Sequence, residues 1–277
     1  MKKLIIYIVA FSALFIVGCS NASAKKAPRK IAVQTWTFHK NTLVETLEML
    51  KTTPVRALEI YPGMKIGGKY PDVRFTEWMN PEQRAYVKEL LAKDGFKVIG
   101  YGVTNCTTEK GIRIMCRFAQ EFGIKAISTE TKKEHLPLWD RVLNDYPDVK
   151  LVIHCHQKGS GNDYYNPEVV MDLIKDTKNV GVCADNGAWA TSGVDNVKAF
   201  KTVKDKLIEI HFKDIKEFGK LNSPTVIYGT GSLPLKEILA ELDAQGYDGY
   251  FIIEDGSAAG NDPLGNVKKS VEYLLNN

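Results

Sequence analysis

The chain has 277 residues, of which 44% are hydrophobic and 25% charged, a composition typical of a globular protein with a large core. Its five cysteines lack CxxC spacing, which argues against a zinc cluster and against a small disulfide-bonded scaffold. The formal net charge of +4 arises at the N-terminal end. Two lysines in 1–18 and four basic residues in 19–30 carry more positive charge than the net charge of the whole chain. The remaining chain has no excess of positive charge, so we expect no nucleic acid partner.

The first residues have the layout of a secretory signal. Two lysines precede the apolar run 4–17, which is too short to span a membrane comfortably. The run closes on Ile-Val-Gly before Cys19, which resembles the lipobox of bacterial lipoproteins. We predict a signal peptide over 1–18, lipidation of Cys19 and a flexible tether over 19–30, and therefore a lipid-anchored protein of the bacterial cell envelope, on the periplasmic or outer-membrane side. An ordinary cleaved signal with an incidental cysteine is the alternative.

After the tether, short apolar runs alternate with amphipathic segments. The runs predicted to be strands are Ile31–Phe38, Ala57–Tyr61, Lys97–Val103, Ala126–Glu130, Lys150–His156, Val180–Asp185, Leu207–Ile215 and Tyr250–Glu254. The segments predicted to be helices are Thr42–Lys51, Pro81–Asp94, Lys110–Phe122, Leu136–Tyr146, Pro167–Asp176, Asp195–Val203, Pro234–Ala244 and Pro263–Leu275.

Local signals mark the ends of these helices. Asn80, Asn166 and Asp262 each precede a proline suited to the first helical position, and glycines follow several helix ends. Eight strand–helix units with buried parallel strands predict a (β/α)8 TIM barrel, formed by a single domain over 31–277. A doubly wound open sheet is the alternative, but the first strand–helix turn, 37–41, lacks the glycines typical of that fold.

Polar side chains end most of the predicted strands, which is where TIM barrels build their active sites. Such groups are costly in a core unless they are paired or bind a ligand. Imidazoles and carboxylates on neighbouring strands predict one mixed nitrogen and oxygen metal site. The strand-end candidates are Glu59, Glu130, His154, His156, Asp185, His211, Lys213 and Glu254.

We assign the metal to His156, Asp185, His211 and Glu254. His154 and His156 point to the same side of their strand, so one can bind metal while the other orients substrate. His156 is favoured as the ligand because it lies nearer the barrel mouth. An Asn-Gly turn signal follows Asp185, so a turn-capping aspartate is the alternative for that residue.

Catalytic and substrate-binding roles go to the remaining groups. Glu254 or Glu130 is expected to act as the base, and His154 or His156 as the acid. Lys213 would stabilise developing negative charge, with a plain surface lysine as its alternative. The residues predicted to bind substrate are Glu59, Trp36 and Trp189. The glycine-containing loop Tyr228–Ser232 is either a phosphate cradle or a plain loop.

The segments LVIHCHQ, CADNGAWATSGVD, IEIHFKD, YGTGSLP and GYDGYFIIE together resemble the xylose isomerase-like TIM-barrel superfamily of sugar isomerases and epimerases, which includes inosose dehydratase-like enzymes. The resemblance implies one divalent cation (Mn²⁺, Mg²⁺, Co²⁺ or Zn²⁺), held by Asp185, His211, Glu254 and a fifth-strand position. Two departures stand out. His154 occupies the position of a common fifth-strand glutamate, and Ala188 replaces the histidine of an Asp-x-Gly-His pattern.

The resemblance implies a divalent-metal-dependent isomerase or epimerase that acts by enolisation of a keto-sugar. We expect a non-phosphorylated sugar, because sugar phosphates are scarce outside the cytoplasm. A lyase or dehydratase performing β-elimination on 3-keto-glycosides is the first alternative, because a neutral oxidised glycoside also suits a location outside the cytoplasm. The two departures disfavour a symmetrical two-glutamate epimerisation. A catalytically inactive carbohydrate-binding lipoprotein is the second. The expected partners are a small sugar and, through the lipid, a membrane; the sequence leaves the oligomeric state open.

Overall fold

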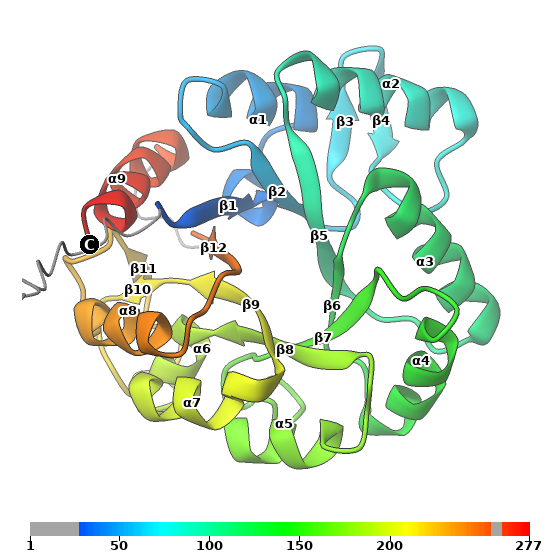
Figure 1. Ribbon diagram of the computed structural model, residues 1–277. Helices are drawn as coiled ribbons and strands as arrows, with labels where there is room; N and C mark the ends of the chain where they lie inside the picture. The colour runs from blue at the N-terminus through cyan, green and yellow to red at the C-terminus, as the bar shows by residue number, and fades with distance from the viewer. Residues whose placement is uncertain (1–27, 256–261) are drawn as a thin grey trace, which may run out of the picture.

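The structure is a computed structural model that describes residues 28–255 and 262–277. Eight parallel strands close into a barrel in the order β1, β12, β9, β8, β7, β6, β5, β2, with β1 paired to both β12 and β2 (Figure 1). This confirms the TIM barrel predicted from the sequence. The strands are β1 (Lys30–Gln34), β2 (Ala57–Ile60), β5 (Lys97–Thr104), β6 (Ala126–Thr129), β7 (Lys150–His154), β8 (Val180–Asp185), β9 (Leu207–Phe212) and β12 (Tyr250–Ile253).

Helices surround the barrel, each close to its predicted range. The outer helices are α1 (Leu43–Leu50), α2 (Pro81–Lys93), α3 (Glu109–Phe122), α4 (Leu136–Leu143), α5 (Pro167–Ile174), α7 (Asn196–Val203), α8 (Leu235–Ala244) and α9 (Pro263–Asn276). The side chains of Asn80, Asn166 and Asp262 accept hydrogen bonds from the first turns of α2, α5 and α9, with proline at the start of each helix. The predicted caps therefore fix where these helices begin.

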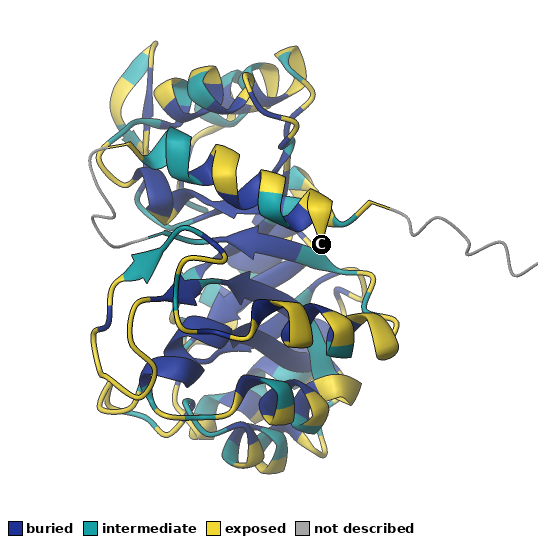
Figure 2. Cartoon of the chain, turned by 90° about the vertical axis from the view of Figure 1, so that its left-hand side faces the viewer, coloured by how far each residue is buried: buried dark blue, intermediate teal, exposed yellow. Residues whose placement is uncertain are grey.

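The core lies between the strands and the helix ring. Every residue of β6 and β8 is buried, because helices cover the outside of the barrel and side chains fill its inside. Figure 2 shows this as a dark blue sheet behind helices that are yellow on their outer faces. On α3, Ile112, Met115, Cys116 and Ala119 are buried at helical spacing, as the periodicity predicts.

Several short elements were not predicted. β1 ends four residues early, and a 3-10 helix, η1 (Thr35–Phe38), follows it. A hairpin of β3 (Lys65–Gly67) and β4 (Tyr70–Arg74) extends the connection after β2, and β10 (Asp214–Ile215) pairs with β11 (Thr225–Val226) after β9. A short helix, α6 (Asn186–Thr191), directly follows β8. Two further 3-10 turns are η2 (Lys133–His135) and η3 (Lys204–Lys206). Two- to six-residue elements leave too little periodicity in the sequence to be recognised.

The N-terminal segment joins the barrel earlier than predicted. β1 begins at Lys30, and the Arg29 guanidinium donates to both Asp243 carboxylate oxygens at 2.7 and 3.0 Å and lies over the Phe251 ring. Arg29 and Lys30 therefore belong to the fold rather than to the tether. The predicted signal peptide 1–18, the lipidation site Cys19 and the tether as far as residue 27 lie outside the described residues. Among the helices of the described chain, none is long and apolar enough to cross a membrane.

Candidate metal centre and its surroundings

Four side chains from consecutive barrel strands meet at the carboxyl end of the barrel. His154 ends β7, Asp185 ends β8, His211 lies near the end of β9, and Glu254 follows β12. Parallel pairing sets His211 opposite both Asp185 and Ile252, which brings the neighbouring strand ends level. One ligand atom of each of the four residues lies within 4.8 Å of all the others. We call these residues the four-residue cluster.

The cluster fits a divalent cation. Nδ1 of His211 lies 2.8 Å from Oε2 of Glu254, and Nε2 of His154 lies 3.6 Å from Oδ2 of Asp185. Among the residues that the structure describes, neither imidazole nitrogen has a hydrogen-bond partner of suitable geometry, although both are buried. An unpartnered buried nitrogen is costly, and a cation between the four residues would satisfy both nitrogens. Two imidazoles and two carboxylates are donors that suit zinc and related divalent ions.

Glu59 lies beneath the cluster and lines neither of the two cavities that adjoin it. The sequence predicted a substrate-binding residue, but the side chain is completely buried inside the barrel. Its carboxyl group accepts hydrogen bonds from Ser128 Oγ and, at 2.5 Å, from His211 Nε2. Because Nε2 faces Glu59, Nδ1 is the ring nitrogen of His211 that faces the cluster. Glu59 therefore holds the His211 imidazole in its orientation toward the four-residue cluster.

Replacing Glu59 with leucine is expected to lower the affinity for a divalent cation by about 10–100-fold, the usual effect of losing a carboxylate behind a metal-bound histidine. Glu59→Gln is the matched control, because the amide oxygen still accepts a hydrogen bond from His211 Nε2. Competition between Co²⁺ and a chromophoric chelator measures the dissociation constant. An unchanged constant in the leucine variant, with the fold intact by circular dichroism, would show that Glu59 does not orient His211.

His154, not His156, supplies the imidazole on β7. Backbone pairing of β7 with β8 ends at His154, opposite Cys183, so His156 lies two residues beyond the strand. His154 Nδ1 donates to Oε1 of Glu130 at 2.9 Å, which leaves Nε2 directed at the cluster. Burial alone would raise the pKa of Glu130, but His154 outweighs burial and lowers it. The assignment of His156 to the metal therefore gives way to His154, because the strand ends two residues earlier than predicted.

Asp185 caps a helix, as one of its two predicted roles requires, and is also placed in the four-residue cluster. Its Oδ1 accepts the backbone N–H of Ala188 at 2.8 Å and caps α6, while its Oδ2 faces the cluster and lies 2.7 Å from Lys213 Nζ. Burial alone would raise the pKa of Asp185, but Lys213 and His154 outweigh burial and hold it well below its ordinary value. The carboxylate is therefore charged and available to a cation.

Lys213 places a positively charged side chain beside the cluster. Its Nζ lies 2.7 Å from Asp185 Oδ2 and 2.9 Å from Glu254 Oε2. Burial would lower the pKa of Lys213, but Asp185 and Glu254 outweigh burial and raise it, so the ammonium stays charged. Asn186 holds the lysine backbone through two hydrogen bonds, of 2.6 and 2.8 Å. A side chain at Gly187 would collide with the lysine, because a Cβ there would lie 2.8 Å from Lys213 Cδ.

Two cavities adjoin the four-residue cluster. The small lobe, of about 300 Å³, is lined by Tyr61, Glu130 and His154 among others. The large lobe, of about 490 Å³, has Lys213 in its lining. Both sizes fall in the range of small-molecule sites. The residues shared by the two lobes are Trp36, His156 and Glu254.

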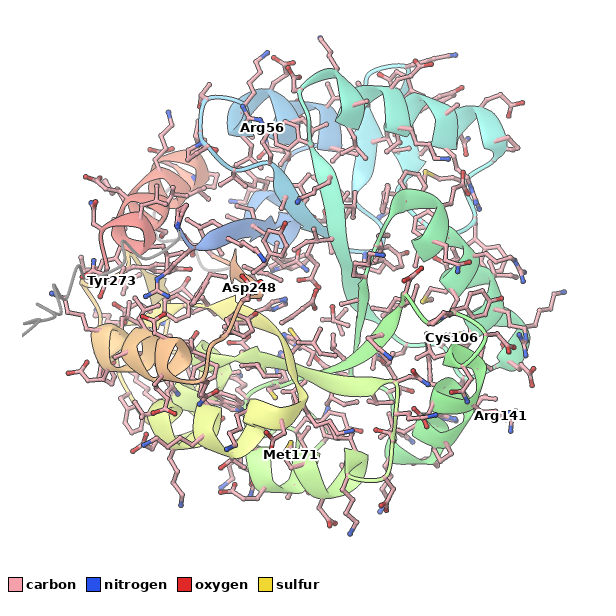
Figure 3. The ribbon with its side chains drawn as sticks, viewed as in Figure 1. Arg56, Cys106, Arg141, Met171, Asp248 and Tyr273 are labelled. Atoms are coloured by element: carbon pink, nitrogen blue, oxygen red, sulfur yellow. The ribbon has the colours of Figure 1, made fainter. Side chains whose placement is uncertain are left out.

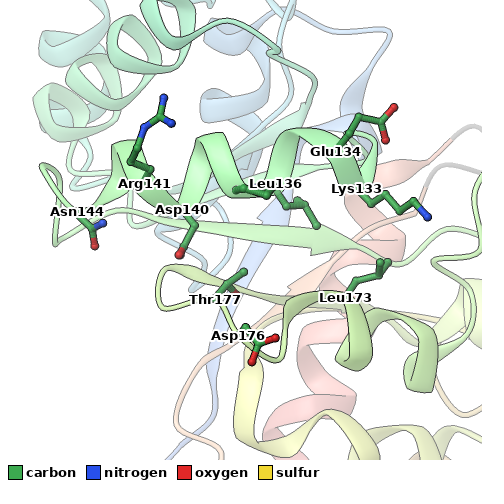
Figure 4. A pocket seen from close by; sticks show the side chains of 10 residues that line it. Lys133, Glu134, Leu136, Asp140, Arg141, Asn144, Leu173, Asp176 and Thr177 are labelled. Carbon is green, nitrogen blue, oxygen red and sulfur yellow. The ribbon is translucent and has the colours of Figure 1, made fainter.

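A third cavity, of about 610 Å³, lies on the outside of the barrel between α4 and the end of α5 (Figure 4). Its lining includes Leu136, Asp140 and Leu173 but none of the strand-end residues. Arg141 of α4 points away from the ring of outer helices, whereas other side chains fill the interior of the barrel (Figure 3). The candidate chemistry therefore belongs to the two smaller lobes.

Comparison with known proteins places the chain in a family. The family model of the xylose isomerase-like TIM barrel matches residues 47–277. The chain belongs to this family. An inosose dehydratase from Lacticaseibacillus casei is 25% identical over 138 residues, covering 44% of this chain and 46% of that protein. One from Geobacillus thermodenitrificans is 24% identical over 140 residues and is covered to 44%. The chain thus spans less than half the length of these curated relatives.

Solved structures agree with this xylose isomerase-like barrel. An uncharacterised protein from Parabacteroides distasonis is 26% identical and superposes with a TM-score of 0.72, covering 90% of this chain and 99% of the other. A D-tagatose 3-epimerase-like protein is 16% identical, with a TM-score of 0.67 over 89% of this chain and 98% of the other. The second likeness shows the shared fold alone.

The two tryptophans predicted to bind sugar have different places in this xylose isomerase-like barrel. Trp36 is 45% exposed and borders both lobes, with its ring stacked on His39 at a centroid distance of 4.9 Å. Trp189 is completely buried and packs edge-on against Phe200 of α7. Trp189 is therefore a core residue, because it falls on the unpredicted helix α6, which turns its ring away from the barrel mouth.

Replacing Trp189 with alanine is expected to lower the free energy of unfolding by about 3–5 kcal/mol, the usual cost of removing a large buried aromatic side chain. Trp189→Phe should recover most of that loss, because phenylalanine fills much of the same space. Urea denaturation followed by circular dichroism measures both. A loss below about 1 kcal/mol for the alanine variant would mean that the ring does not pack in the core.

Two residues around the site were missed by the sequence reasoning. Glu209 faces the barrel interior beneath His211, and burial together with Glu59 raises its pKa well above the ordinary value. Strand alternation provides a signal for it, because Glu209, His211 and Lys213 alternate on one face of the β9 segment. Asn186 gave no such signal, since its role depends on the contact between α6 and the end of β9.

Proposed function

We propose that this protein is a divalent-metal-dependent enzyme that removes a proton from the carbon next to the carbonyl group of an uncharged keto-sugar. The observation that carries the proposal is that two buried imidazole nitrogens, which have no hydrogen-bond partner among the described residues, converge with two carboxylates between the lobes. When bound, the cation acts as a Lewis acid that polarises the carbonyl and raises the acidity of the neighbouring C–H. The family's named isomerase, epimerase and dehydratase members agree with this class of reaction.

Glu130 is our candidate for the base. Its side chain is 23% exposed and lines the small lobe, and its Oε1 accepts the hydrogen bond from His154 Nδ1. Within the described part of the chain no hydrogen bond to the other carboxylate oxygen is found, so this oxygen can accept a substrate proton. Glu254 is the poorer candidate, because its Oε2 already lies 2.9 Å from Lys213 Nζ and 2.8 Å from His211 Nδ1 within the four-residue cluster. We therefore assign Glu254 to the cation and proton transfer to Glu130.

Lys213 supports the charge that develops on the substrate. Its ammonium is held in place by Asp185, Glu254 and the Asn186 clamp, and it lines the large lobe beside the cluster. A fixed cation stabilises an oxyanion more effectively in a buried site than in water, because it needs no reorganisation during the reaction.

An uncharged sugar suits the lobes better than a sugar phosphate. The loop Tyr228–Ser232, one candidate for a phosphate cradle, instead wraps around Asp214: the amides of Gly229 and Gly231 donate to Asp214 Oδ2 at 3.0 and 2.8 Å. Among the described residues that line the two lobes there is no arginine, and the charge of Lys213 is balanced by two carboxylates. These features support a non-phosphorylated substrate.

Isomerisation or epimerisation requires the proton to return to another carbon or another face. Elimination is the second candidate reaction, and His156 favours it. This imidazole borders both lobes, and its buried Nδ1 has no hydrogen-bond partner in the described part of the chain. It is placed to give a proton to a leaving oxygen. The relatives named as inosose dehydratases agree with that outcome.

The direct test is the exchange of carbon-bound hydrogen in keto-sugars for deuterium from deuterated water. Protein reconstituted with Mn²⁺ or Zn²⁺ should catalyse deuterium incorporation next to the carbonyl, and chelator-treated protein should not. Mass spectrometry of the recovered sugar and its products also separates isomerisation from elimination. If metal-loaded protein binds sugar tightly but catalyses no exchange, the enzyme proposal is wrong and a carbohydrate-binding protein is favoured.

A further inference from the structure

The two lobes differ in the chemistry of their linings. Glu130, our candidate for the base, and the cluster residue His154 line the small lobe. The large lobe shares Trp36, His156 and Glu254 with the small lobe, and it also contains Asp185 paired with Lys213. The other described side chains that line it do not titrate near neutral pH. They carry mainly amides, hydroxyls and small apolar groups. The polar ones include Gln157, Thr191, Asn222 and Ser223. A lobe of this kind recognises a polyhydroxylated group without transforming it.

The outer wall of the large lobe is held in shape before any ligand binds. Gln157 and Asn222 form two hydrogen bonds: Gln157 Nε2 donates to Asn222 Oδ1 at 2.6 Å, and Asn222 N donates to Gln157 Oε1 at 3.1 Å. Asn222 has a φ of +57°, a left-handed conformation that asparagine tolerates. These bonds tie the segment after β7 to the connection between β10 and β11, so the wall spans two barrel loops. A prebuilt wall reduces the entropy lost on binding.

The small side chain of Ala188 leaves space in the large lobe. This residue is 7% exposed, lies in the first turn of α6 and contributes only a methyl group to the lining. Its backbone is fixed by the Asp185 side chain, so α6 cannot easily shift. A larger side chain at this position would project into the lobe and reduce its volume.

Trp36 joins the two lobes. Its exposed ring borders both of them, and Tyr61 supports it edge-on at a centroid distance of 5.2 Å. An exposed indole offers a flat apolar face on which the C–H face of a sugar ring can stack. A ligand at the cluster can therefore extend past Trp36 from one lobe into the other.

We infer that the large lobe is a subsite for a second, uncharged sugar ring, so that the substrate is a keto-glycoside with its oxidised ring in the small lobe and its other ring in the large lobe. The inference rests on the proposed function for the reacting ring. Its own support is the prebuilt amide wall, the space left by Ala188 and the shared tryptophan.

The experiment compares two probes that share the reacting ring. Methyl 3-keto-β-glucoside carries one ring, and 3-ketocellobiose carries a second glucosyl ring in place of the methyl group. Deuterium incorporation by the metal-loaded full-length protein gives kcat/KM for each, and calorimetry gives the dissociation constants. The variants are Ala188→Phe, which fills the lobe, Gln157→Ala, which breaks the wall, and the control Ala188→Ser, which leaves the space open.

We expect the wild-type protein to favour 3-ketocellobiose by about tenfold or more, and Ala188→Phe to remove that preference, because filling a pocket acts on the group that enters it. Gln157→Ala should reduce the preference, and Ala188→Ser should keep it. Equal kcat/KM for the two probes, or the same ratio in wild type and Ala188→Phe, overturns the subsite. If neither probe exchanges, the proposed reaction has failed, and the calorimetric preference and its loss in Ala188→Phe still decide the subsite.

Discussion

Replacing Glu130 with glutamine is expected to slow deuterium exchange by about 10²–10⁴-fold, the usual contribution of a positioned general base, while the metal content stays at the wild-type level. The two effects separate because the amide oxygen can still accept a hydrogen bond from His154 Nδ1, which the structure places 2.9 Å from Glu130 Oε1. The imidazole therefore keeps its orientation toward the cluster, and the variant loses only its ability to take a proton.

Glu254→Gln is the informative comparison for this prediction. As a residue of the four-residue cluster, it should lower both metal content and exchange. If Glu130→Gln exchanges at the wild-type rate while Glu254→Gln binds metal normally and does not exchange, the base is Glu254 and the assignment to Glu130 is wrong.

The His211→Ala variant is expected to lose the cation. Removing an outer carboxylate from a metal-bound histidine typically costs 10–100-fold in affinity, so removing the imidazole itself should cost more than about 100-fold. The buried Glu59 would also lose its partner on β9. Metal analysis after equilibrium dialysis measures the loss, and exchange should fall to the level of chelator-treated protein.

His156→Ala is the matched control, because it removes a neighbouring imidazole and leaves all four residues of the cluster in place. This variant should keep its metal. Loss of metal in His156→Ala with retention in His154→Ala would restore the assignment made from the sequence and contradict the geometry at the end of β7.

Much of the fold follows from local patterns. Apolar runs separated by capped amphipathic helices predict all eight barrel strands, because parallel barrel strands are buried on both faces and need continuous apolar sequence. Asn80, Asn166 and Asp262 mark helix starts correctly, since capping depends on neighbours in sequence. Short hairpins and the helix α6 depend on tertiary contacts and leave no periodic signal.

The site was predictable only as far as strand ends could be recognised. Asp185, His211 and Glu254 end apolar runs, and the barrel topology brings them together. The choice between His154 and His156 depends on where pairing of β7 with β8 stops, which alternation alone does not fix. Glu59 and Trp189 also lie beside apolar runs, but contacts across the barrel and with the helix layer bury them.

Metal stoichiometry tests the central claim most directly. The full-length protein should be stripped with a chelator, dialysed against Mn²⁺, Co²⁺ or Zn²⁺ in turn, and its bound metal measured by mass spectrometry beside His211→Ala. We expect one divalent cation for each chain of the wild-type protein and none for the variant. A folded wild-type protein that takes up none of these ions, or a variant that binds as much as the wild type, would contradict a metal centre built from His154, Asp185, His211 and Glu254.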